Sequence, residues 1–159
     1  MKEITITAHI KIYQFDELSK DDQELMTAAM EATKRSYSPY SQFAVGAAIR
    51  LRNSVIVSGS NQENAAYPSG LCAERTTLFY ANSQYPDQPV DVLAVAAYNK
   101  GSFLKDPIPP CGACRQVVLE TEARYKNPIR ILLYGTDGIY EMKGISDLLP
   151  LSFNASSME

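Results

Sequence analysis

The chain has 159 residues, of which 45% are hydrophobic and 21% charged, as expected for one soluble domain with a sizeable core. Its net charge of −3 gives no basic surface for nucleic acid or for an anionic membrane, so we expect neither as a partner. No apolar run is long enough to cross a bilayer, and the first residues lack the apolar region of a signal peptide, which predicts a cytoplasmic protein with reduced thiols.

The first predicted elements are a strand, a helix and a hairpin. Residues 3–15 alternate between apolar and polar types, with isoleucine at many of the apolar positions, which predicts a half-buried strand. A serine followed three residues later by an acid is a capping pattern, and it predicts a helix over about 19–36. Residues 44–52 and 55–60 predict two strands joined by a tight turn.

The rest of the chain alternates strands with helices. The pattern predicts a polar loop over residues 61–71, a helix over 72–83, a buried strand over 91–98 and a helix over 111–125. It then predicts a buried strand over 129–134, a hairpin strand over 139–143 and a short helix over 145–149. This alternation predicts a three-layer α/β domain around a mixed sheet. We expect a single domain over residues 19–159, preceded by residues 1–18 as an extension that forms an extra strand.

Three cysteines and one glutamate stand in two short segments, Cys72-Ala73-Glu74-Arg75 and Pro110-Cys111-Gly112-Ala113-Cys114. Both segments start a predicted helix, whose free N–H groups and partial positive charge favour thiolates. Cys111 and Cys114 are three residues apart, so one helical turn can direct both at one ion. Three protein ligands leave a position for water, which is typical of catalytic zinc. Glu74 is placed to move that water's protons, and Arg75 to donate to the thiolates.

Other uses of the cysteines also fit part of the pattern. A C-x-x-C pair alone serves redox chemistry or forms half of a zinc ribbon, but a redox pair has no need of Cys72, and a ribbon requires a second pair that the chain lacks. Three inert, buried cysteines are the remaining alternative.

Further motifs surround these two segments in a specific order. They are Tyr37-Ser38-Pro39-Tyr40-Ser41 with Phe43, Val45-Gly46-Ala47-Ala48, Asn61-Gln62-Glu63-Asn64-Ala65-Ala66-Tyr67-Pro68, Cys72-Ala73-Glu74-Arg75-Thr76, Pro110-Cys111-Gly112-Ala113-Cys114-Arg115-Gln116, and Leu148-Leu149-Pro150 with Phe153. Over about residues 20–153 the chain resembles the small homotetrameric, Cys₃-type cytidine deaminases of the cytidine/deoxycytidylate deaminase superfamily. The resemblance implies an α/β/α fold around a mixed five-stranded sheet. The alternation near the N-terminus, which lies outside the resemblance, predicts an extra strand within residues 1–18.

The resemblance also implies a function and a cofactor. It implies zinc-dependent hydrolytic deamination of cytidine and deoxycytidine to uridine and deoxyuridine in pyrimidine salvage. One Zn²⁺ per subunit would be held by Cys72, Cys111 and Cys114, with Glu74 as the proton shuttle. The implied assembly is a homotetramer with shared active sites.

The implied substrate-binding residues are Phe43, Asn61, Glu63, Ala65, Tyr67, Ala73 and Phe153. Asn61 and Glu63 would bind the 3′-hydroxyl of the ribose, and the backbone N–H of Ala73 would bind the pyrimidine O2. Phe43 would pack against the base, whereas Tyr67 and Phe153 would reach a neighbouring subunit's pocket. Arg75 and Gln116 would support the site from just outside these contacts.

Related activities and one departure stay open at this point. A blasticidin-type nucleoside deaminase and a catalytically inactive zinc-binding domain share the zinc motif. A nucleotide deaminase needs cations for the phosphate, but loop 61–67 carries an acid and no base, which argues against this activity. A polynucleotide deaminase needs a basic groove, which the acidic net charge disfavours. The resemblance says nothing about residues 1–18, whose strand either extends the sheet edge or contacts another subunit.

Overall fold

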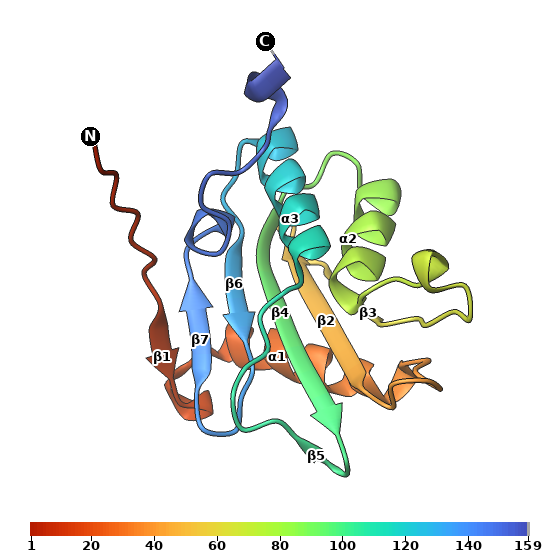
Figure 1. The fold of residues 1–159 in the computed structure, drawn as a ribbon. Coiled ribbons are helices and arrows are strands. Elements are labelled where there is room, and N and C mark those ends of the chain that lie inside the picture. Colours follow the sequence, from red (N-terminus) through yellow and green to blue (C-terminus); the bar gives the residue numbers. More distant parts are fainter. Residues whose placement is uncertain (159) are drawn as a thin grey trace.

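The computed structural model describes residues 1–158 as a central sheet with helices on both faces (Figure 1). The strands are β1 (Lys11–Tyr13), β2 (Ala44–Leu51), β3 (Ile56–Ser60), β4 (Val90–Asn99), β5 (Ser102–Phe103), β6 (Arg130–Leu133) and β7 (Ile139–Met142). The helices are α1 (Lys20–Ala32), α2 (Ala73–Gln84) and α3 (Gly112–Tyr125), with 3₁₀ turns at Phe15–Glu17, Thr33–Arg35, Tyr67–Ser69, Ile145–Asp147 and Ala155–Met158. Within residues 1–158, every helix is too short or too polar to span a membrane.

The sheet is mixed, as predicted. Its strand order is β1-β7-β6-β4-β2-β3, and β5 pairs with β4 beside this path. Strands β4 and β6 run parallel, because α3 crosses between them, and the other described pairs are antiparallel. The five strands that the pattern predicts after residue 19 are all present, and β1 and the two-residue β5 bring the total to seven.

Two apolar cores separate the helices from the sheet, which confirms the three-layer prediction. Helices α2 and α3 cover one face and α1 covers the other (Figure 1). Alternate residues of β4 serve the two cores: Leu93 and Val95 pack under α2 and α3, while Val92 and Ala94 pack against α1. This strand is therefore apolar on both faces and reads in the sequence as a continuous hydrophobic run.

Helix α1 lies very close to β2 at Gly46. A Cβ atom on Gly46 would stand 2.1 Å from the carbonyl oxygen of Ala29 and 2.7 Å from the amide nitrogen of Thr33. Because both neighbours are backbone atoms, they cannot rotate away. We expect Gly46→Ala to lower the free energy of unfolding by about 3 kcal/mol, as overpacking does. Chemical denaturation of the two proteins measures this loss.

The matched control for this prediction is Gly112→Ala. A Cβ atom on Gly112 meets nothing within 4 Å, and this glycine is the first residue of α3. Alanine is the better helix former, so this change should leave stability equal or raise it by up to about 1 kcal/mol. If both variants lost the same stability, the close approach at Gly46 would not be the cause.

A partly buried ion cluster ties α1 to the sheet. Asp22 accepts hydrogen bonds from Arg130 at 2.6 and 2.9 Å and from Arg50 at 3.0 Å, and Arg130 also donates to Glu141 at 2.9 Å. Burial raises the pKa of Asp22, but the hydrogen bonds with Arg130 and Ser19 and the charges of Arg130 and Arg50 together outweigh it and hold the pKa below its usual value. The Ser19 hydroxyl caps α1 by accepting from the Asp22 amide at 3.2 Å, as the capping pattern predicts.

The predicted half-buried strand over residues 3–15 is wrong for most of its length. Only Lys11–Tyr13 pair with β7, and residues 1–10 form no regular secondary structure. The Ile4 side chain is 82% exposed and Ile6 51%. In this register the last residue of β7, Met142, stands opposite Ile10, so β7 does not continue beside residues 1–9. The helix predicted over 19–36 also ends earlier as an α-helix, at Ala32, and continues as a 3₁₀ turn.

Candidate active site

Three thiols meet where α2 and α3 begin. Cys72 is the N-cap of α2 and Cys111 the N-cap of α3, so both helices start where the sequence predicts. The Cys72 and Cys111 sulfurs are 3.7 Å apart, those of Cys111 and Cys114 are 3.5 Å apart, and all three lie within 4.8 Å of one another. Three thiolates about 2.3 Å from one tetrahedral Zn²⁺ stand about 3.8 Å apart, so this donor set fits zinc.

The surroundings of the sulfurs favour negative charge. The Arg75 guanidinium donates to the Cys72 sulfur at 3.6 Å. Hydrogen bonds from Cys114 and then from Arg75 lower the pKa of Cys72 to about 5, against the effect of burial. The pKa of Cys114 is raised, because its proton is shared with Cys72 and because the thiol is buried. The Arg75 Nε atom is buried without a hydrogen-bond partner among the described residues. A bound cation would replace the shared proton and stabilise the negative charge of the sulfurs.

Glu74 stands beside the thiols, in the first turn of α2. Its side chain is almost fully buried, although a glutamate in a first helical turn is usually exposed. Burial raises the pKa of the Glu74 carboxyl, and the negative charge of Cys72 raises it further. Both effects make the protonated form of this carboxyl group easier to reach, as a group that carries protons requires.

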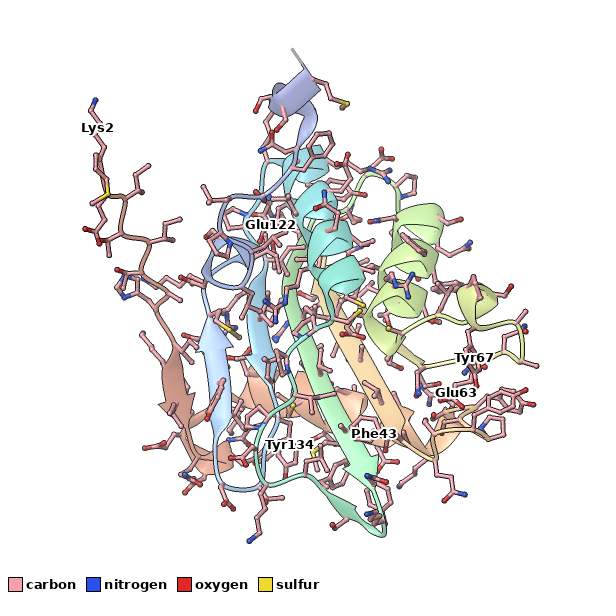
Figure 2. All side chains as sticks on the ribbon, viewed as in Figure 1. Lys2, Phe43, Glu63, Tyr67, Glu122 and Tyr134 are labelled. Atoms are coloured by element: carbon pink, nitrogen blue, oxygen red, sulfur yellow. The ribbon has the colours of Figure 1, made fainter. Side chains whose placement is uncertain are left out.

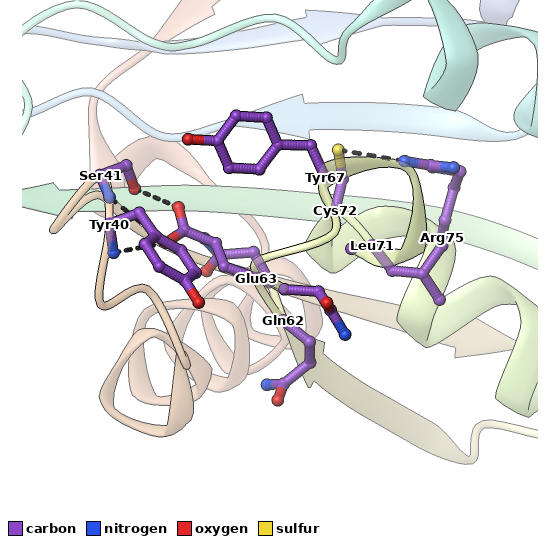
Figure 3. A pocket seen from close by; sticks show the side chains of 11 residues that line it. Tyr40, Ser41, Gln62, Glu63, Tyr67, Leu71, Cys72 and Arg75 are labelled. Carbon is purple, nitrogen blue, oxygen red and sulfur yellow. Dashed lines mark hydrogen bonds between the residues drawn. The ribbon is translucent and has the colours of Figure 1, made fainter.

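A pocket of about 530 Å³ opens next to Cys72 and Arg75 (Figure 3). Its walls come from the turn before β2 and from the loop between β3 and α2, and the lining residues are Tyr40, Ser41, Asn61, Gln62, Glu63, Asn64, Tyr67, Gly70, Leu71, Cys72 and Arg75. This volume is in the range of sites for small organic ligands. Five of the predicted site residues therefore line one cavity: Asn61, Glu63, Tyr67, Cys72 and Arg75.

The remaining predicted site residues are not among the lining residues of this pocket; they are Phe43, Ala65, Ala73, Glu74, Cys111, Cys114, Gln116 and Phe153. Ala73 and Glu74 are buried in the first turn of α2, between the pocket residues Cys72 and Arg75 in the sequence. Phe43 is half-buried just before β2, on the same side of the molecule as Glu63 and Tyr67 (Figure 2). The Gln116 side chain donates to the backbone carbonyl of Phe153 at 2.9 Å, and the Phe153 ring is 60% exposed.

Asn61 and Glu63 already have partners within the chain. The Asn61 carboxamide oxygen accepts from the Ser36 hydroxyl at 2.5 Å and the Val45 amide at 2.8 Å, and its nitrogen donates to the Phe43 carbonyl at 2.9 Å. These bonds fix the turn before β2 against β3.

The Glu63 carboxylate holds the neighbouring turn. It accepts from the Ser41 hydroxyl, from the Tyr40 amide at 2.9 Å and from the Ser41 amide at 3.3 Å (Figure 3). The bond from Ser41 is the main reason that the pKa of Glu63 lies below its usual value. Three hydrogen bonds still leave one acceptor position on the carboxylate, directed by a fixed side chain that lines the pocket.

Sequence reasoning missed several pocket residues, above all Tyr40, Ser41 and Gln62. Tyr40 and the 79% exposed Tyr67 meet edge to face, with ring centroids 6.3 Å apart, and so form one wall of the pocket. The signal for Tyr40 and Ser41 was available, because both belong to the motif at residues 37–41. Their role was not apparent, because it depends on a carboxylate 22 residues further along the chain.

A metal-binding α/β/α domain is the class that the fold and the thiol cluster define. The model of the family described as "Cytidine and deoxycytidylate deaminase zinc-binding region" matches residues 19–126, and the chain belongs to this family. A cytidine deaminase of Halalkalibacterium halodurans is 39% identical over 138 residues, which are 87% of this chain and 98% of the relative. One of Sporosarcina psychrophila is 36% identical over 138 residues, 87% of this chain and 95% of the relative.

Solved structures agree with this assignment. The cytidine deaminase of Burkholderia pseudomallei is 38% identical, with a TM-score of 0.69 over 82% of this chain and 97% of that one. The cytidine deaminase of Mycobacterium tuberculosis is 32% identical, with a TM-score of 0.67 over 86% of this chain and 99% of that one. The predicted fold and family are therefore confirmed.

Proposed function

We propose that the protein is a zinc-dependent cytidine deaminase, which hydrolyses cytidine and deoxycytidine to uridine and deoxyuridine for pyrimidine salvage. Its catalytic domain spans residues 19–159. The observation that carries the proposal is the cluster of three thiols with the buried carboxyl of Glu74 beside it, next to a pocket of about 530 Å³. A purely structural zinc site has no use for such a carboxyl group, and the relatives' names support the substrate.

In this proposal Cys72, Cys111 and Cys114 hold one Zn²⁺ per subunit. When bound, the ion supplies a Lewis acid that activates the attacking water. Glu74 accepts a proton from that water and delivers it to N3 of the cytosine ring, which makes C4 more electrophilic. The oxygen of that water bonds to C4. Glu74 then takes the second proton from this oxygen and passes it to the amino group, so that the C4–N bond breaks, ammonia leaves and a carbonyl remains at C4. Arg75 offsets the charge of three thiolates, which would otherwise oppose loss of a proton from the water.

Substrate positioning falls to residues of the pocket and of the first turn of α2. The free acceptor position of Glu63 and the amide group of Asn61 bind the ribose hydroxyl. The backbone N–H of Ala73 has no acceptor within α2, because this residue starts the helix, and it binds the pyrimidine O2. Phe43 packs against the base, and Ala65 lies on the same loop as Glu63.

We further propose a homotetramer with shared active sites, in the cytoplasm. Support for assembly comes from exposed large apolar side chains on one subunit, among them Tyr37, Tyr67, Phe79, Tyr80, Leu151 and Phe153. Tyr67 and Phe153 complete a neighbour's pocket in this assembly. The three cysteines are free, and they must remain reduced to bind a metal, which suits a reducing compartment.

The test is turnover by the zinc-loaded protein. We expect the ultraviolet absorbance of cytidine and of deoxycytidine to change as each is converted to its uracil product, with release of one ammonia per nucleoside. Cytidine monophosphate and blasticidin serve as comparisons in the same assay. Turnover of blasticidin alone would replace the proposal by a blasticidin-type activity, and a fully zinc-loaded protein that converts none of these substrates would be a zinc-binding domain without this activity.

A further inference from the structure

Residues 1–10 leave the sheet edge as an extended, exposed segment (Figure 1). The match to the family begins only at residue 19, so this segment adds to the part of the chain that relatives share. Figure 2 shows Lys2 at its outer end, away from the sheet and on the opposite side of the molecule from Glu63 and Tyr67. The segment therefore lies away from the pocket of its own chain.

The segment has the chemistry of a strand without a partner. Every second residue is apolar, from Ile4 to Ile12, and Ile4, Ile6, Ile10 and Ile12 are 82%, 51%, 46% and 60% exposed. The residues between them are polar or charged. Exposing four isoleucines to water is unfavourable by about 25 cal/mol for each Å² of apolar surface. Covering these side chains with another protein surface would therefore be favourable.

The backbone of β1 is paired on one side only, and residues 1–8 make no hydrogen bond within the described residues 1–158. β1 pairs with β7 through one edge, and the His9 amide donates toward the same side, to the Asp147 carboxylate at 3.0 Å. Backbone groups alternate in direction along an extended strand. In an extended continuation of β1, the N–H and C=O groups of Ile4, Ile6, Ala8 and Ile10 would face the outer edge, where they could pair with another strand.

We propose that the segments of two copies of this chain pair as antiparallel strands about a two-fold axis at Thr7. In this register Thr7 faces Thr7, Ile6 faces Ala8 and Ile4 faces Ile10, so the apolar residues of both copies share one face. Glu3 of each copy faces Lys11 of the other, which gives two opposite-charge pairs.

Neighbouring registers lack this complementarity. Centring the axis on Ile6 places Lys11 opposite Met1, and centring it on Ala8 places Glu3 opposite Tyr13, so both lose the Glu3–Lys11 pair. A slip of one residue brings apolar side chains opposite polar ones along the whole segment. The pairing would join two sheets edge to edge through β1 and leave the pocket, beyond β3 at the other end of the strand order, untouched.

Disulfide formation in the full-length, zinc-loaded protein tests the register. Directly opposed residues in an antiparallel pair have the separation that a disulfide requires. Thr7→Cys should form a covalent dimer under mild oxidation at least about tenfold faster than Thr5→Cys, because pairing raises the effective concentration of only the Thr7 thiols. Thr5→Cys mixed with His9→Cys should cross-link as well, since these positions face each other. The wild-type protein, treated identically, reports on the native cysteines.

Two results would overturn the proposal. Equal cross-linking by Thr7→Cys and Thr5→Cys would mean that mobile ends collide at random, and no cross-link at Thr7 would mean that the segments do not meet. A charge test adds a second measurement in the Thr7→Cys background. Glu3→Lys should slow the cross-link, and Glu3→Lys with Lys11→Glu should restore it. Cytidine turnover should stay unchanged throughout, so a failure here is separate from a failure of the proposed activity.

Discussion

Replacing Glu74 by glutamine should abolish turnover while leaving the metal site intact. Glutamine has nearly the shape of glutamate but cannot carry a proton between water, N3 and the leaving amino group. We expect kcat for cytidine to fall at least about 10³-fold, since one group would perform all of these transfers. The zinc content should stay at one ion per subunit, because Glu74 is not one of the three clustered thiol ligands.

Glu120→Gln is the matched control for this change, because Glu120 is an exposed acid on the neighbouring helix α3. It removes the same charge from the chain and should leave both kcat and zinc content at the wild-type level. The melting temperature of Glu74→Gln should match or exceed that of the wild type, since a buried carboxyl group becomes a neutral amide. If Glu74→Gln kept most of its activity, the assignment of Glu74 as the proton shuttle would be incorrect.

The parts of the site that the sequence predicts well are those set by local chemistry. A proline or glycine loop followed by a cysteine predicts a helix start, and Cys72 and Cys111 are both N-caps. A helix positions residues three apart on one side, which is why Cys111 and Cys114 converge without any knowledge of the fold. The meeting of Cys72 with this pair requires only that α2 and α3 share one sheet face.

The parts that escape prediction depend on contacts between distant segments. Glu63 is recognisable as a candidate ligand, but its bonds to Tyr40 and Ser41 arise only when the β3–α2 loop folds beside the turn before β2. The ion cluster around Asp22 likewise joins residues 108 positions apart. Such partners leave no periodic signal, since each residue type is common on protein surfaces.

The N-terminal segment shows a different limit. Its alternation is a true local signal for an extended strand, and residues 11–13 do join the sheet. Alternation does not say whether a partner strand exists within the same chain, and β7 ends at Met142, so it provides none for residues 1–9. The prediction for residues 3–10 is therefore wrong about burial and about pairing within the chain. The same alternation of apolar and polar residues is the basis for the proposed pairing between two copies.

Replacing Cys111 by alanine should remove the metal and part of the stability with it. The site draws one thiol from the start of α2 and two from the start of α3, so a bound ion joins the two helices. A ligand that binds only the folded state stabilises it by about 4 kcal/mol at 1,000 times its Kd. We expect zinc content near zero and a lower melting temperature, both measured on protein purified with added zinc.

Two comparisons separate loss of the metal from damage to α3. Ala113→Ser changes an exposed residue in the same helical turn and should keep zinc, activity and stability. Chelation should lower the melting temperature of the wild type to about that of Cys111→Ala and should leave the variant unaffected, because the variant has no bound ion to lose. A variant that retained one zinc per subunit would show that Cys72 and Cys114 hold the ion without Cys111, and the three-thiol site would be wrong.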